Sequence, residues 1–101
     1  MIDKEMERIV SLTIKFEKQF KLDRDEVLRY ILEKMGYKKC NYIPEIYDTE
    51  DLDLIQNLIY QYNKKRALSV ETFIYNFCNY YNYCITYGFQ ADLNHTLCLK
   101  E

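Results

Sequence analysis

The side chains best suited to metal chemistry include an acidic run near the middle of the chain, namely Asp48, Glu50, Asp51 and Asp53. An EF-hand loop would place its ligands at alternate positions around a glycine turn and add a distal glutamate. The glycine is missing from this run. Carboxylates in the first turn of a helix stabilise its positive end. We therefore expect these residues to begin a helix and not to hold a cation.

His95 and Cys98 are three positions apart, a spacing at which two side chains on one helix could bind zinc. Cys78 or Cys84 would have to complete that site, but these thiols point about 120° apart around a helix. No CxxC pair occurs, and we expect all four cysteines, Cys40 included, to be reduced. With one histidine and no glycine-rich phosphate loop, the sequence predicts no catalytic residue, no metal and no cofactor.

Two short basic clusters could contact nucleic acid, Lys38–Lys39 and Lys64–Lys65–Arg66. Exposed tyrosines beside them could stack on the bases of a single strand while the cations follow its phosphates. The net charge of −2 and the pI of about 5.4 are far from the basic footprint of such proteins. A nucleic-acid-binding regulator that uses Lys64, Lys65 and Arg66 is therefore the alternative function.

Composition favours a soluble globular protein. With 101 residues, 49% hydrophobic and 30% charged, the chain can form one compact domain over 1–101. No apolar stretch is long enough to cross a bilayer, and the opening MIDKEMERIV lacks the apolar centre of a signal peptide. We expect a cytoplasmic protein without a membrane partner. Isoleucine, lysine, asparagine and tyrosine have A/T-rich codons and abound here, which suggests an A/T-rich genome such as that of a low-GC bacterium, its phage or a mobile element.

Hydrophobic periodicity predicts four helices. The first runs from Ile2 to Phe20 with an apolar stripe about 200° wide, which suggests contact with two neighbours. The second runs from a cap at Asp23 to a left-handed stop at Gly36, with Tyr30 off its stripe and partly exposed. The third is capped by Thr49 or Asp48 and ends at Lys64, Lys65 and Arg66. Its apolar face comprises Leu52, Leu54, Ile55, Leu58, Ile59 and Tyr62.

Two segments are less regular. The chain from Tyr37 to Thr49 holds the only proline, yet it is too apolar for a mobile linker. We expect an ordered loop with a short helical turn that lies over the helices. The tail from Phe89 to Glu101 fits either a short helix or a strand, and we favour a short helix. The predicted fold is all-α, a compact bundle of four main helices plus a short C-terminal element.

The fourth helix, capped by Ser69 and stopped by Gly88, has the most unusual composition. From Phe73 to Phe89 it contains eight aromatic residues, three asparagines and no charge. At 100° per residue one face forms an ordinary core stripe, made of Phe73, Ile74, Phe77, Cys78, Tyr81, Cys84 and Ile85. The opposite face carries the candidate partner-binding residues Tyr75, Asn76, Asn79, Tyr80, Tyr83 and Tyr87.

Solvated helix faces usually carry lysine, glutamate or arginine, whereas this one offers rings, hydroxyls and amides. Protein interfaces concentrate tyrosine and asparagine because these side chains combine large area with adaptable hydrogen bonding. The sequence therefore predicts a non-catalytic protein-binding module whose partner is another protein or a second copy of the chain. Its most concrete form is a small phage or mobile-element inhibitor of a host defence protein. The competing interpretation is that another part of the chain covers this face.

Overall fold

The computed structural model describes residues 3–36 and 43–88, and in these ranges the chain is all-α, as predicted. Within these ranges, four α-helices and one short 3-10 helix follow one another. They are α1 (Lys4–Phe20), α2 (Arg24–Lys34), η1 (Glu45–Tyr47), α3 (Glu50–Arg66) and α4 (Val70–Tyr87). The helical turn expected before Thr49 is η1. The expected C-terminal helix lies outside the described residues.

Each α-helix begins at a side chain that accepts a hydrogen bond from a backbone N–H of the first turn. Asp23 accepts from Glu26 at 2.8 Å, and Thr49 and Ser69 act in the same way on α3 and α4, as predicted. The cap of α1 is Asp3, which accepts from the Met6 N–H at 3.0 Å. The predicted helix began at Ile2, which lies outside the described residues, and a cap at Asp3 was not predicted.

Two of the helices end at the predicted glycines. Gly36 and Gly88 have φ values of 81° and 82°, where a side chain would be strained. Lys21 after α1 and Ala67 after α3 also adopt left-handed conformations. Their backbone N–H groups donate hydrogen bonds to carbonyls in the last turn of the helix that each one follows. The N–H groups of the next residues, Leu22 and Leu68, do the same.

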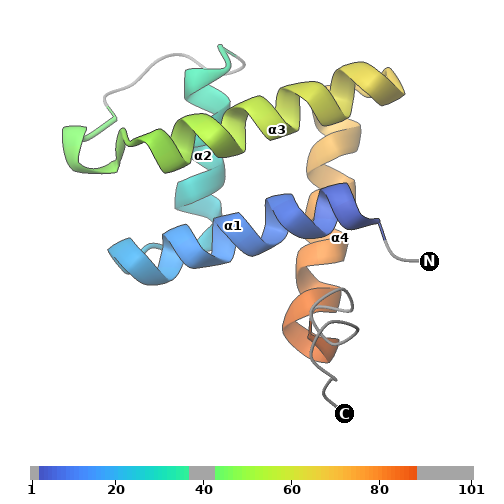
Figure 1. The fold of residues 1–101 in the computed structure, drawn as a ribbon, viewed down its shortest axis with the longest axis horizontal. Coiled ribbons are helices and arrows are strands. Elements are labelled where there is room, and N and C mark those ends of the chain that lie inside the picture. Colours follow the sequence, from blue (N-terminus) through green and yellow to red (C-terminus); the bar gives the residue numbers. More distant parts are fainter. Residues whose placement is uncertain (1–2, 37–42, 89–101) are drawn as a thin grey trace.

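The helices form two crossed layers (Figure 1). α1 and α3 lie side by side and antiparallel, while α2 and α4 cross behind them at a steep angle. α1 packs against each of the other three α-helices. The width of its apolar stripe predicted contact with two neighbours, and the structure has a third. α1 can contact all three because its buried side is long and wide, comprising Met6, Ile9, Val10, Thr13 and Phe16.

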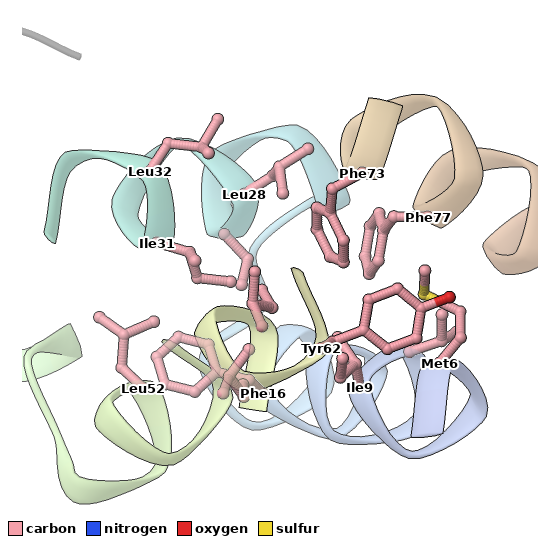
Figure 2. Close-up of a cluster of buried hydrophobic side chains, with 14 of the residues drawn as sticks. Met6, Ile9, Phe16, Leu28, Ile31, Leu32, Leu52, Tyr62, Phe73 and Phe77 are labelled. Atoms are coloured by element: carbon pink, nitrogen blue, oxygen red, sulfur yellow. The ribbon is translucent and has the colours of Figure 1, made fainter. Parts of the chain in front are cut away.

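The core lies between the two layers (Figure 2). Phe73 and Phe77 of α4 point toward Met6 and Ile9 of α1, with the Tyr62 ring of α3 beside them. The Phe73 ring is 5.8 Å from that of Phe77 and 6.0 Å from that of Tyr62, measured between centroids. The aromatic content of α4 is therefore partly a structural requirement.

Two burial predictions, one on α2 and one on α3, were wrong. Tyr30 is buried, because Tyr47 of η1 stacks on its ring at 5.5 Å and covers the position that the helical pattern left open. Leu54 was assigned to the core but is 38% exposed, because its neighbours Leu52 and Ile55 fill the contact with the other helices. In both cases a neighbouring element, and not the helix's own periodicity, decides the burial.

Asp3 joins the start of α1 to the end of α3. One carboxylate oxygen caps α1, and the other accepts a 2.7 Å hydrogen bond from the Tyr62 hydroxyl. Burial, followed by this contact, raises the pKa of Tyr62 to about 12. The Arg66 guanidinium lies 3.8 Å from the Tyr62 ring centroid and 2.6 Å from the Glu5 carboxylate. The first turn of α1 is therefore fixed to the last turn of α3 by several polar contacts.

Asp3→Ala should lower the free energy of unfolding by about 2 kcal/mol, because it removes a helix cap and leaves the buried Tyr62 hydroxyl without its acceptor. Asp23→Ala is the matched control, since it removes a cap alone, and should cost about 1 kcal/mol. Urea unfolding of both variants measures the difference. Equal losses would mean that the Asp3–Tyr62 contact contributes nothing.

Candidate interaction surface on α4

The buried side of α4 is narrower than its apolar pattern predicts. Only Phe73, Phe77 and Cys84 are fully buried on this helix, while Ile74, Cys78 and Tyr81 are half-buried. The last turns of α4 extend past α1 (Figure 1), so the helix has fewer neighbours there than at its start. Burial and the nearby Glu7 carboxylate of α1 raise the pKa of Cys84 to about 11.

Ile85 was assigned to the core stripe, and this prediction was wrong. It is 62% exposed. The side of α4 at this level that meets α1 is occupied by Cys84, and Ile85 points about 100° away from it. The helical period predicted the direction of Ile85 correctly. It could not predict that no described element lies in that direction.

Four of the six candidate partner-binding residues are exposed. Tyr75 is 69% exposed, Tyr87 64% and Tyr83 40%, and Asn79 is exposed as well. They are spaced at i, i+4, i+8 and i+12, so they form one continuous row along the helix. We call the row Tyr75, Asn79, Tyr83 and Tyr87 the tyrosine ridge. None of the side chains from Thr72 to Gly88 is charged.

The other two candidates, Asn76 and Tyr80, are half-buried. Tyr80 packs against the core, and burial together with the nearby Glu7 raises the pKa of its hydroxyl. Its ring centroid is 5.8 Å from that of Tyr83, which is 5.0 Å from that of Tyr87. Tyr80 therefore joins the exposed rings to the core, and the sequence did not separate this role from an exposed one.

The opposite flank of α4 contains a carboxyl–phenol pair that was not predicted from the sequence. Tyr81 donates a 2.7 Å hydrogen bond to Glu17 of α1, and the Arg24 guanidinium of α2 lies 5.2 Å from the Tyr81 ring centroid. Burial raises the pKa of Glu17, although the Tyr81 hydrogen bond opposes this shift. The two residues are 64 positions apart, and no local sequence signal connects them.

The cations of the alternative nucleic-acid site are largely engaged within the fold. Arg66 pairs with Glu5 at 2.6 Å, and Lys65 lies 3.5 Å from the same carboxylate. The Lys64 ammonium is 5.8 Å from the Tyr60 ring centroid. The Glu5 carboxylate therefore offsets part of the charge that a phosphate would meet at this end of α3.

The residues considered as metal ligands in the sequence make ordinary structural contacts where the structure describes them. Of the acidic run, Asp48 and Asp53 pair with Lys34, and Thr49 together with the acidic first turn begins α3 as predicted. Within 3–36 and 43–88, no three His, Cys, Asp or Glu side chains are grouped to hold a metal ion. Cys78 and Cys84 are free thiols. His95, Cys98 and Cys40 lie outside the described residues.

Three cavities lined by described residues lie apart from the ridge. They have volumes of about 200, 220 and 290 Å³, and no ridge residue belongs to their walls. Typical small-molecule sites measure roughly 300–1,000 Å³. An exposed row of rings on a convex helix suits contact with another macromolecule better than capture of a small ligand.

No protein-family model, curated protein or solved structure matches this chain. Within the described ranges, none of the helices has the length and apolar character needed to cross a membrane.

Glu17→Gln should raise the melting temperature at neutral pH. Because the folded pKa of Glu17 is raised, the fold favours the protonated carboxyl, and the associated stability is lost as pH rises through that pKa. The amide stays neutral at every pH and still accepts from Tyr81. The gap between variant and wild type should therefore close below pH 4.5, the ordinary pKa of the group. Thermal unfolding of both proteins as a function of pH measures this difference in melting temperature. A variant less stable than the wild type at neutral pH would contradict the raised pKa of Glu17.

Proposed function

We propose that this chain is a non-catalytic protein-binding module that contacts its partner through the tyrosine ridge of α4. The observation that carries the proposal is the exposure of Tyr75, Tyr83 and Tyr87 on a helix face without charges. Large uncharged aromatic patches are uncommon on the free surface of monomers and common at interfaces. Tyrosine is also among the residues that most often dominate binding energy.

The surrounding structure supports the ridge as a rigid binding surface. Tyr80 packs against the core and contacts the Tyr83 ring, while Phe73 and Phe77 anchor the same helix on its inner side. Tyrosine side chains have few rotatable bonds, so rings carried by a packed helix lose little conformational entropy on binding. By contrast, the exposed positions of α1 and α3 carry many lysines, arginines, aspartates and glutamates, as an ordinary solvated surface does.

The biological setting that fits best is inhibition of a host protein by a small protein of phage or mobile-element origin. Its support is an amino-acid composition rich in isoleucine, lysine, asparagine and tyrosine, whose codons are rich in A and T. The alternative, a nucleic-acid-binding regulator, has less support because Lys65 and Arg66 already pair with Glu5. Salt separates the two functions, since phosphate binding weakens steeply between about 50 and 200 mM salt.

The test is capture of a partner from a lysate of the source organism by the tagged full-length chain. Tyr83→Ala should weaken binding to the captured protein by about 2 kcal/mol, roughly 30-fold, because it removes a central ring of the ridge. Because Tyr83 is exposed, the melting temperature of the Tyr83→Ala variant should differ little from that of the wild type. Tyr80→Ala is unsuitable as the probe because its ring packs against the core.

Tyr60→Ala is the matched control. Tyr60 is 51% exposed and lies on α3, away from the ridge, so its removal should leave capture unchanged. Capture that persists in Tyr83→Ala and disappears in about 200 mM salt would argue against the ridge and for phosphate recognition.

A further inference from the structure

We propose that the partner of the tyrosine ridge is a second copy of this chain, with two α4 helices packed against each other about a twofold axis. This inference rests on the proposed function, because it names the occupant of the same surface. Three properties of the ridge support it: the chemistry of its side chains, their spacing along α4 and the area that they expose.

The chemistry of the ridge is self-complementary. In a twofold interface the same surface patch serves on both chains, so residues near the axis meet their own copies. Charged residues there would repel, but α4 has none from Thr72 to Gly88. Tyrosine hydroxyls and asparagine amides both donate and accept hydrogen bonds, so each can pair with an identical group. A second copy therefore meets no like-charge repulsion along this face.

The spacing of the ridge matches a common mode of helix packing. Tyr75, Asn79, Tyr83 and Tyr87 form an i±4n row, and interdigitation of two such rows gives the packing class with an angle of about −50°. Both helices use the same kind of row in this class, as two identical chains must. The small Asn79 between Tyr75 and Tyr83 leaves a notch in the row. A twofold axis midway between positions 79 and 83 places Tyr83 of each chain against this notch in the other.

The exposed area is sufficient for a modest dimer. Tyr75, Tyr83 and Tyr87 together expose roughly 350 Å², given that a tyrosine can bury about 150–250 Å². The exposed Asn79, Asn82 and Thr86 bring this to roughly 500 Å² per chain. The total for two chains is then about 1,000 Å², at the lower limit for specific interfaces. We therefore expect a dissociation constant on the order of micromolar.

Sedimentation velocity of the purified chain tests the proposal. Concentrations from about 1 to about 500 µM cover the expected dissociation constant of the dimer. The wild type should pass from monomer to dimer over this range. Tyr83→Glu should raise the dissociation constant by about 30-fold or more, because it places a carboxylate in the buried centre of the interface. Its melting temperature at low concentration should match that of the wild type. Tyr60→Glu, the same substitution on α3, should leave the dimer intact.

The unfavourable outcomes differ between this inference and the proposed function. A wild type that stays monomeric throughout, while Tyr83→Glu still abolishes capture of a different protein, overturns the dimer and keeps the proposed function. A dimer that persists in Tyr83→Glu assigns self-association to another surface and also overturns this inference. If Tyr83→Glu lowers the melting temperature of the monomer and changes no binding, the ridge is covered within the chain and both proposals fail.

Discussion

Burial of α1 against the other three α-helices is the constraint on which the rest of the structure depends. α3 lies beside it, while α2 and α4 cross it on the inner side (Figure 1). A helix that meets three neighbours must be apolar over most of its circumference, and the wide stripe containing Met6, Ile9 and Phe16 satisfies this requirement. Because α1 is held in this way, polar contacts from Asp3 and Glu17 can position the end of α3 and the middle of α4.

The sequence was informative about most features that local geometry decides, although the Asp3 cap of α1 was missed. Caps at Asp23, Thr49 and Ser69 and stops at Gly36 and Gly88 follow from side-chain and backbone chemistry within a few residues, and they were predicted. Burial set by distant elements was not predictable in the same way. Tyr30 is covered by Tyr47, and the Tyr81–Glu17 pair forms between residues that are remote in sequence.

The candidate surface shows the same division between local and tertiary information. Helical periodicity placed Tyr75, Asn79, Tyr83 and Tyr87 on one side of α4, and this side is exposed in the structure. Periodicity also placed Tyr80 there, yet its ring packs against the core. Whether a tyrosine on this side is exposed or packed against the core depends on how closely α1 approaches α4. The residue pattern of α4 alone does not contain that information. Codon usage can make tyrosine plentiful, but it does not explain the missing charges.

The last turns of α4 have a consequence for local motion. After Phe77 only Cys84 is fully buried on this helix, and Ile85 and Tyr87 are both more than half exposed. Helix ends with few buried contacts open at a small free-energy cost, well below that of global unfolding. Backbone amides near Tyr87 should therefore exchange with solvent faster than those near Phe73. The end of α4 can therefore open and close without any rearrangement of the core, while the turns that carry Phe73 and Phe77 stay packed.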